Sequence, residues 1–376
     1  MTPRLLQRLC SAMACAALLG NAALAAVTVH KVATPPALRP LQMSIGGRML
    51  ITSSANTAFG ARDYTYQWPG SYFRAEFAGT SVFFRIVAGD EILHVQADGR
   101  RVATLTKPEP GVYEIDGLSQ GNHRIGVYVA TESQAGPDAF GGFAIPQDER
   151  ALTPPQRHRE IEFIGDSMTV GYGDLSATRT CTRDKVWSDT DDTSAFGPMI
   201  ARHYAADYQV NAISGRGIVR NYDGTQADTL PEAYPWILFD RKQQYRDPAW
   251  KPQVLVIALG TNDFSTPLHA GERWKTRDDL HADFEATYLR FLEELRAGNP
   301  HAGIVVWATE MANGEIEAEA QKVVDQMRKN GDPHIVFVPI NGLSFTACDS
   351  HPSLADEKTI AEKLEHAIDA DAQVWK

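Results

Sequence analysis

The sequence IEFIGDSMTV, residues 161–170, decides how the second half of the chain folds. An apolar run with one charge in it ends abruptly at Gly165-Asp166-Ser167, and a helix-compatible segment follows. This pattern predicts a strand that runs into a sharp turn. Ligands bind at the carboxyl ends of the strands in an open parallel sheet, so the turn puts the Ser167 hydroxyl where chemistry occurs. Ser167 is therefore our candidate nucleophile, although most Gly-Asp-Ser turns have no such role.

From residue 160 onward, strand-like and helix-like patterns alternate. The clearest helix is predicted at residues 278–297, where Leu280, Phe284, Tyr288, Leu292 and Leu295 recur at helical spacing and Thr276 or Asp278 can cap its start. Strands that alternate with helices predict an α/β fold with a parallel sheet between helical layers. The predicted strands are residues 160–165, 208–213, 253–259, 303–309 and 334–339.

The preceding part of the chain has a different texture. Short runs of aromatic and β-branched residues between 42 and 146 are separated by Gly, Asp and Pro about every ten residues. This spacing predicts an antiparallel β-sandwich domain. Residues 26–41 are expected to be a lead-in without periodicity, residues 147–159 a polar, Pro-containing linker, and residues 160–376 the α/β domain.

The first 25 residues resemble a secretory signal peptide. Arg4 and Arg8 precede an Ala- and Leu-rich run, and Ala23-Leu24-Ala25 has the small-x-small form of a cleavage site. An uncleaved anchor is the alternative, but the run is short for a membrane span. Without this segment 34 of the 36 basic residues remain against 47 acidic ones, a net charge of −13. We therefore expect a periplasmic or secreted protein with no membrane span after cleavage and no nucleic-acid partner.

The cysteines fit an oxidising compartment. Cys10 and Cys15 lie in the signal segment, which leaves Cys181 and Cys348 with a single possible pairing. Two buried free thiols are the alternative. If the two are bonded, the bond closes a very long loop.

The other predicted strands also end in chemically useful residues. Right-handed crossovers bring these turns to the same edge of the sheet, so residues far apart in the sequence can meet there. His351 can take a proton from the Ser167 hydroxyl, and the N–H groups of Ser167 and Gly215 with the amide of Asn262 can bind an oxyanion. The segments concerned are Ser214-Gly215-Arg216-Gly217, Gly260-Thr261-Asn262-Asp263 and Cys348-Asp349-Ser350-His351-Pro352.

Together, these segments resemble the four signature blocks of the SGNH/GDSL hydrolases over residues 160–376. The stretches IEFIGDSMTVGYG, SGRGI and CDSHPS, preceded by a β domain and a Pro-rich basic linker, are similar to carbohydrate esterase family 2. That family joins a jelly-roll-like sandwich to an SGNH domain, a three-layer αβα sandwich, and removes acetyl groups from plant polysaccharides. The resemblance implies that Ser167 is the nucleophile and His351 the base, and that Ser167, Gly215 and Asn262 form the oxyanion hole.

The chain departs from the superfamily pattern at the third catalytic residue. Most SGNH enzymes have an aspartate three residues before the histidine, where this chain has Cys348, and Asp349 stands two before it. Residues two apart in an extended segment point to the same side, so we expect Asp349 to complete a triad with Ser167 and His351. The alternative is a Ser–His dyad, thought to occur in the esterase family, in which a backbone carbonyl takes the place of the carboxylate.

An exposed tryptophan at this edge would suit a sugar ring. Trp307, at the end of the fourth predicted strand, is our candidate for substrate binding, supported by the family's use of a tryptophan in roughly this place; packing in the core is the alternative. No metal-binding spacing and no phosphate loop is found in the sequence, so we expect no metal and no cofactor.

The sequence therefore predicts a serine esterase that removes O-acetyl groups from a polysaccharide such as xylan or glucomannan through an acyl-enzyme. We expect a monomer whose partner is that polysaccharide. Two other interpretations remain open: a GDSL esterase for lipid, thioester or peptidoglycan O-acetyl substrates, and a noncatalytic carbohydrate-binding protein.

Overall fold

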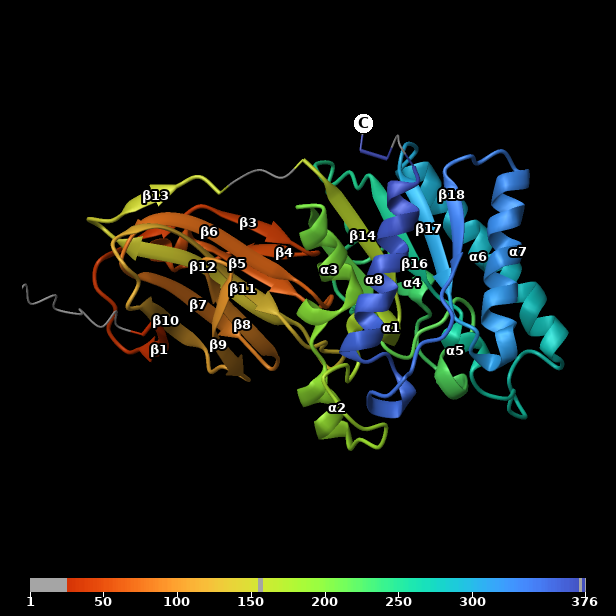
Figure 1. Ribbon diagram of the computed structural model, residues 1–376. Coiled ribbons are helices and arrows are strands. Elements are labelled where there is room, and N and C mark those ends of the chain that lie inside the picture. Colours follow the sequence, from red (N-terminus) through yellow and green to blue (C-terminus); the bar gives the residue numbers. More distant parts are fainter. Residues whose placement is uncertain (1–25, 155–157, 372–373, 376) are drawn as a thin grey trace, which may run out of the picture.

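The computed structural model describes residues 26–154, 158–371 and 374–375, and the predicted signal peptide lies outside this part of the chain. The described residues form a β-sandwich followed by an α/β unit, and the two lie side by side (Figure 1). Both halves of the predicted fold are therefore confirmed. Within the described residues, no helix combines the length and apolar character needed to cross a bilayer.

The sandwich consists of two antiparallel sheets that pack face to face. Inward-facing aromatic side chains fill the space between them, as in the stacked pair Phe73 and Phe140, whose ring centroids are 4.1 Å apart. The first sheet has the order β1-β10-β7-β12-β5-β4 with β2 paired to β12, and the second has the order β13-β6-β11-β8-β9 with β3 paired to β6. The first sheet contains β1 (Thr28–Val32), β2 (Leu38–Leu41), β4 (Leu50–Ser53), β5 (Arg62–Tyr66), β7 (Val82–Ala88), β10 (Gly111–Asp116) and β12 (Asp138–Pro146). The second contains β3 (Met43–Gly46), β6 (Tyr72–Gly79), β8 (Ile92–Ala97), β9 (Arg100–Thr106), β11 (Gly121–Val129) and β13 (Arg150–Leu152).

Three strands lie in segments expected to be irregular. β1 and β2 lie in the predicted lead-in and pair with β10 and β12, and β13 lies in the predicted linker and pairs with β6. β1 and β13 are sheet edges, and β2 carries Pro40. Short edge strands like these are held mainly by backbone pairing to one neighbour, so their sequences lack the alternation that marks a central strand.

The α/β unit is built on a parallel sheet of order β15-β14-β16-β17-β18. In chain order this is 2-1-3-4-5, which puts the topological switch point between β14 and β16. The strands are β14 (Glu160–Gly165), β15 (Asp207–Ala212), β16 (Val254–Ala258), β17 (Gly303–Ala308) and β18 (Ile335–Pro339). The helices are α1 (Ser167–Val170), α2 (Arg183–Asp189), α3 (Phe196–His203), α4 (Leu230–Ala233), α5 (Thr261–Phe264), α6 (Arg277–Gly298), α7 (Glu315–Lys329) and α8 (Leu354–Asp369).

Helices cover both faces of this sheet (Figure 1). α6 and α7 pack on one face and α3 and α8 on the other, because alternate strand residues point to opposite sides. α6 begins with the capping box of Thr276 and Asp279, and its predicted apolar stripe is buried in the core.

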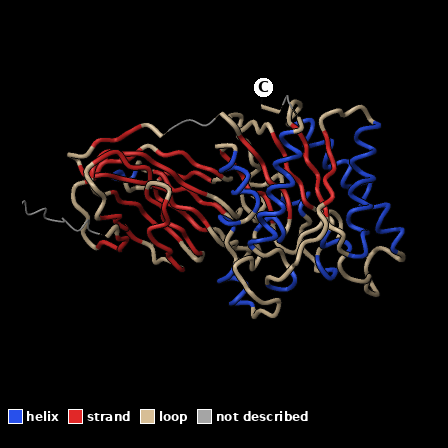
Figure 2. The backbone as a smooth tube through the Cα atoms, viewed as in Figure 1, coloured by secondary structure: helices blue, strands red, loops and turns tan. Residues whose placement is uncertain are grey.

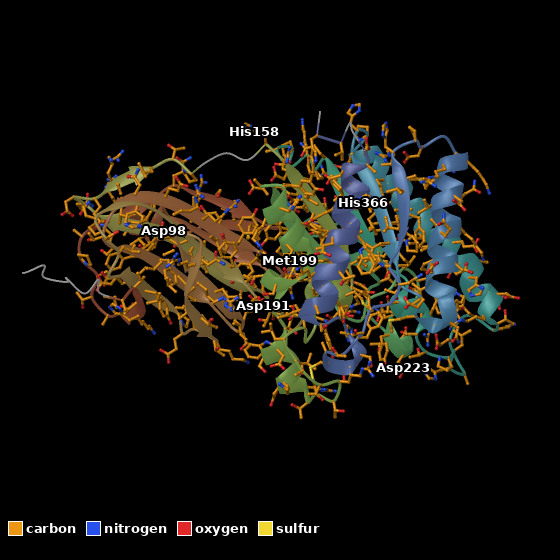
Figure 3. The ribbon with its side chains drawn as sticks, viewed as in Figure 1. Asp98, His158, Asp191, Met199, Asp223 and His366 are labelled. Atoms are coloured by element: carbon orange, nitrogen blue, oxygen red, sulfur yellow. A yellow bond between two sulfur atoms is a disulfide. The ribbon has the colours of Figure 1, made fainter. Side chains whose placement is uncertain are left out.

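The two halves share a buried interface. Trp68 of the sandwich belongs to the hydrophobic cluster under α6, and Tyr72 to the cluster under α3. Arg48 pairs with Glu162 at 3.3 Å, both side chains being almost fully buried. Asp191, at the junction in Figure 3, lies 3.2 Å from His94 and 3.1 Å from Arg101 of the sandwich. These contacts hold the sandwich against the α/β unit.

Candidate active site

The turn after β14 sets the position of Ser167. Asp166 directly follows β14 and is the N-cap residue of α1. Its Oδ1 accepts a hydrogen bond of 3.0 Å from the N–H of Met168. Ser167 is the first residue of α1 and is 5% exposed. Loops gather at the carboxyl edge of the sheet, where α1 begins (Figure 2).

His351 meets Ser167 at this edge. Its Nε2 lies 2.7 Å from the Ser167 hydroxyl oxygen, although the two residues are 184 positions apart. Its Nδ1 lies 3.0 Å from the carbonyl oxygen of Cys348, an acceptor, so Nδ1 carries the hydrogen and Nε2 is the free base. Burial lowers the pKa of His351, which keeps the imidazole neutral and able to accept a proton.

The predicted place of Asp349 in a triad is corrected by this geometry. Residues 348–350 form a short 3-10 turn and Asp349 has a φ of +51°, so the alternation expected of an extended segment does not apply. The carbonyl of Cys348 occupies the position predicted for the carboxylate. Asp349 instead accepts a hydrogen bond of 3.0 Å from the hydroxyl of Tyr172.

Tyr172 and Arg179 hold the loop of the base, and the sequence patterns did not single out either residue. The Tyr172 ring lies 4.2 Å from the imidazole of His351, centroid to centroid. Arg179 donates to the carbonyls of Phe345 at 2.7 Å and Ser344 at 2.8 Å, while its own carbonyl accepts from the Asp349 N–H. The position of Tyr172, five residues after Ser167, could have indicated this contact, because the short helix α1 returns the chain toward His351.

A disulfide joins Cys181 to Cys348, as the single pairing predicted. It connects the segment before α2 to the residue whose carbonyl orients His351. Gly173 passes close to this bond: its φ is +60°, and a Cβ there would come within 2.4 Å of the Cys348 Cβ. Glycine is therefore required for the segment after Ser167 to approach the turn before His351.

The turn after β15 and the start of α5 meet beside Ser167. Gly215 has a φ of +82°, and the space where a Cβ would lie is open to 4 Å, so its backbone is accessible to a substrate. Asn262 is 4% exposed, and its Nδ2 donates to Asp166 Oδ2 at 3.0 Å and to the Arg216 carbonyl at 2.8 Å. Burial raises the pKa of Asp166 to about 7, and the Met168 N–H opposes this shift.

Asp263 fixes the loop that contains Gly215. Its carboxylate accepts three backbone hydrogen bonds, from the N–H groups of Ile218, Val219 and Arg220 at 2.8 to 3.0 Å. Burial raises its pKa to about 6, which these three donors oppose. Since Asp263 follows Asn262 directly, one short helix positions both the amide and the loop opposite it.

The sandwich also contacts this loop, through residues that sequence reasoning missed. Glu132 Oε2 accepts a hydrogen bond of 3.1 Å from the N–H of Ser214, and Gln134 Nε2 donates one of 3.1 Å to the Ser214 carbonyl. Both backbone groups of the residue before Gly215 are thus bound by the other domain. Nothing in the sequence pattern connects residues 132–134 to residue 214, because the contact depends on how the halves pack.

The interpretation of Trp307 as a sugar platform is wrong. The side chain is 2% exposed and lies in the cluster between the sheet and α3, with its ring perpendicular to Phe196 at 5.3 Å. The strand was predicted correctly, but the residue points to the face of the sheet that α3 and α8 cover.

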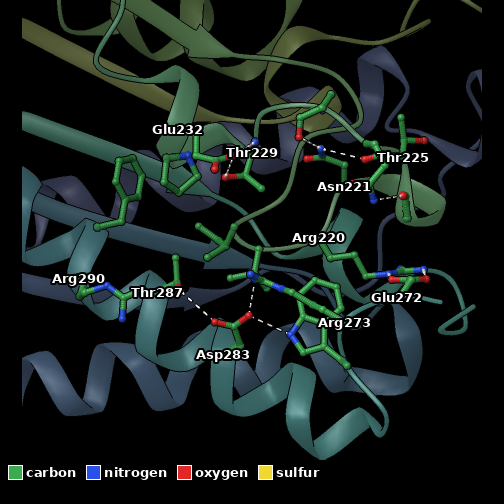
Figure 4. Close-up of a pocket in the computed structure, with 18 of the residues that line it drawn as sticks. Arg220, Asn221, Thr225, Thr229, Glu232, Glu272, Arg273, Asp283, Thr287 and Arg290 are labelled. Carbon is green, nitrogen blue, oxygen red and sulfur yellow. Dashed lines mark hydrogen bonds and ion pairs between the residues drawn. The ribbon is translucent and has the colours of Figure 1, made fainter.

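A cavity of about 690 Å³ lies between residues 218–232, residues 271–274 and the side of α6 (Figure 4). Two ion pairs lie in its wall: Asp283 contacts Arg273 and also accepts from Trp274, and Arg220 binds Glu272 at 2.6 Å. Neither Ser167 nor His351 lines it. The contact between Ser167 and His351 therefore lies outside this cavity.

Comparison with known proteins agrees with this geometry. Residues 57–155 match the model of the carbohydrate esterase 2 N-terminal domain, and residues 163–366 match that of the GDSL-like lipase/acylhydrolase family. An acetylxylan esterase/glucomannan deacetylase of Cellvibrio japonicus is 40% identical over 90% of this chain and 93% of its own length. The cellulase/esterase CelE of Acetivibrio thermocellus is 28% identical over 79% of this chain and 36% of its own.

Solved structures share both halves of the fold. One structure, described as the active site of a carbohydrate esterase with divergent catalytic and non-catalytic binding functions, has a TM-score of 0.85 at 39% identity and covers 90% of this chain and 100% of its own. A family two carbohydrate esterase from Clostridium thermocellum, solved with cellohexaose, has a TM-score of 0.76 at 26% identity and covers 89% and 100%. With a sandwich that matches the esterase 2 model and a hydrolase unit in which serine and histidine meet, this chain belongs to carbohydrate esterase family 2, within the GDSL-like hydrolases, and is a carboxylic ester hydrolase.

Proposed function

We propose that this protein is a serine esterase that removes O-acetyl groups from a polysaccharide of the xylan or glucomannan type through an acyl-enzyme, and that it works in the periplasm or outside the cell. The observation that carries the proposal is the 2.7 Å contact between His351 Nε2 and the Ser167 hydroxyl. The acetylxylan esterase/glucomannan deacetylase at 40% identity supports the choice of substrate. The disulfide supports an oxidising compartment.

In the first half of the reaction, His351 Nε2 takes the hydroxyl proton as the Ser167 oxygen attacks the acetyl carbonyl carbon. The imidazolium that forms keeps its Nδ1–H on the Cys348 carbonyl, 3.0 Å away, and this bond holds the ring while it is charged. The tetrahedral intermediate collapses when His351 returns the proton to the leaving sugar oxygen. Water, activated by the same base, then attacks the acetyl-serine and releases acetate.

The N–H groups of Ser167 and Gly215 and the Asn262 amide are the proposed oxyanion donors. Both Nδ2 hydrogens of Asn262 are in use, one with Asp166 and one with the Arg216 carbonyl. We propose that the oxyanion takes over the hydrogen given to Arg216, because an anion is a stronger acceptor than an amide carbonyl. Asp166 then keeps the amide oriented throughout the reaction.

Acetate release from acetylated xylan, acetylated glucomannan and O-acetylated peptidoglycan tests the proposal, with the wild type and Ser167→Ala measured side by side. We expect release from xylan or glucomannan by the wild type and a loss of several powers of ten in the variant. Release only from peptidoglycan, or equal release by both proteins, would contradict it. A wild type inactive on every short-chain ester would instead favour a noncatalytic carbohydrate-binding protein.

A further inference from the structure

A second cavity, of about 280 Å³, opens where the sandwich meets the hydrolase unit beside the catalytic pair. Each domain supplies part of its wall, and neither domain builds it alone. Its volume is at the small end of ligand pockets and suits one sugar unit rather than a long chain. It is lined by Thr131, Glu132 and Gln134 of the sandwich and by Tyr172, Arg183, Val186, Trp187 and Thr190 of the hydrolase unit.

Two residues that line this cavity, one from each domain, contact His351 and Ser214. Tyr172 lines it, and its ring lies 4.2 Å from the imidazole of His351, centroid to centroid, at an interplanar angle of 33°. Glu132 lines it and accepts from Ser214, the residue before Gly215. A single side chain therefore separates the cavity from His351 on one side and from the loop of Gly215 on the other.

The chemistry of the walls is that of a sugar site. Trp187 is partly exposed and offers an indole, while Glu132, Gln134 and Arg183 offer a carboxylate, an amide and a guanidinium. Rings of this kind pack on the C–H faces of pyranoses and polar groups bind the hydroxyls around them. The indole is held by Lys107 of the sandwich, whose Nζ lies 4.8 Å from the ring centroid and pairs with Asp90 at 2.9 Å.

We propose that this cavity is a glycan subsite shared by the two domains, which binds the sugar unit next to the one that carries the acetyl group. The inference rests on the proposed function, because it names the part of the polysaccharide that the same active site holds. It assigns the sandwich a direct role in substrate recognition, with Trp187 as the residue that contacts the sugar.

The test compares Trp187→Ala with the wild type on acetylated xylo-oligosaccharides or manno-oligosaccharides and on nitrophenyl acetate. We expect KM for the oligosaccharide to rise about tenfold more than KM for nitrophenyl acetate, because the small ester does not reach the subsite. Trp274→Ala is the matched control, since Trp274 lines the larger cavity of Figure 4, which has no residue in common with this one. Thermal unfolding of both variants shows whether they fold.

Arg183→Ala, an exposed substitution that the fold should tolerate, is expected to shift the same ratio about threefold. An unchanged ratio in Trp187→Ala and Arg183→Ala, or a shift in Trp274→Ala alone, would overturn the inference. Binding of the deacetylated oligosaccharide to Ser167→Ala, with and without Trp187→Ala, separates the two proposals. Binding that depends on Trp187 supports the subsite even if the wild type releases no acetate, and that second result would overturn only the proposed function.

Discussion

The carbonyl oxygen of Cys348 lies 3.0 Å from Nδ1 of His351, where a catalytic triad has a carboxylate. A backbone carbonyl can fix the tautomer and the ring orientation as a carboxylate does. It carries only a partial negative charge, so it stabilises the imidazolium less. The turn of residues 348–350 and the disulfide at Cys348 are what keep this acceptor in place.

Replacement of Asp349 by Asn is expected to lower kcat less than about tenfold, because the carboxylate bonds to the Tyr172 hydroxyl and not to the imidazole. Asparagine tolerates the φ of +51° at this position. Steady-state rates on nitrophenyl acetate check this, with Ser167→Ala as the inactive reference. A loss of several powers of ten would restore the triad.

The acid limb of kcat/KM is expected below pH 6.5, the ordinary pKa of histidine, because burial lowers the pKa of His351 and only the neutral ring accepts the serine proton. The negative charge of Asp349 raises this pKa, so the limb should move to still lower pH in Asp349→Asn. A pH profile of nitrophenyl acetate hydrolysis measures both. A limb above 6.5, or a shift to higher pH in the variant, would contradict this account.

Substitution of Cys181 by Ser should lower both the thermal midpoint and kcat. The bond spans 167 residues, so its loss releases chain entropy in the unfolded state worth up to about 5 kcal/mol. It also frees the residue whose carbonyl orients His351. Calorimetry and turnover are the measurements. Thiol titration of unfolded, unreduced residues 26–376 should find no free thiol, and two free thiols would show that the bond does not form.

Asn262→Ala is expected to reduce kcat by about two to three powers of ten with a smaller effect on KM, the usual loss when one oxyanion donor is removed. The substitution also leaves Asp166 Oδ2 without the donor it now has at 3.0 Å. Asn262→Asp provides the comparison, because it keeps the size and loses the donor. Near-normal turnover in both variants would exclude the amide from the oxyanion hole.

The contribution of two buried carboxyls to stability should fall as pH rises from about 5 to about 10, because these groups hold their protons in the folded protein. Burial raises the pKa of Glu357 to about 8 and that of Asp174 to about 10, the latter helped by the charge of Glu357. A group whose pKa is higher in the folded protein than in the unfolded chain contributes its full stabilisation below the unfolded pKa. That contribution is lost as pH rises through the folded pKa. Thermal midpoints of Glu357→Gln should depend less on pH than those of the wild type. Glu362→Gln, an exposed change on α8, should follow the wild type; a variant Glu357→Gln with an unaltered slope would contradict the assignment.

Much of this architecture could be predicted because strong local patterns encode it. The strand before Ser167 and the helix over residues 277–298 are strongly patterned, and topology then brings Ser167, His351 and Asn262 to one edge. What could not be predicted depends on details that patterns do not carry. Asp349 turns away because its backbone is left-handed, and the Trp307 side chain is buried beneath α3 and α8.

The bonds from Glu132 and Gln134 to both backbone groups of Ser214 mean that the two halves of this chain are not interchangeable modules. A hydrolase unit joined to an unrelated sandwich, or expressed without the sandwich, would lose the two hydrogen bonds that hold Ser214 and the loop of Gly215. We therefore expect the two domains to be inherited together, because recombination between them would separate Glu132 and Gln134 from Ser214.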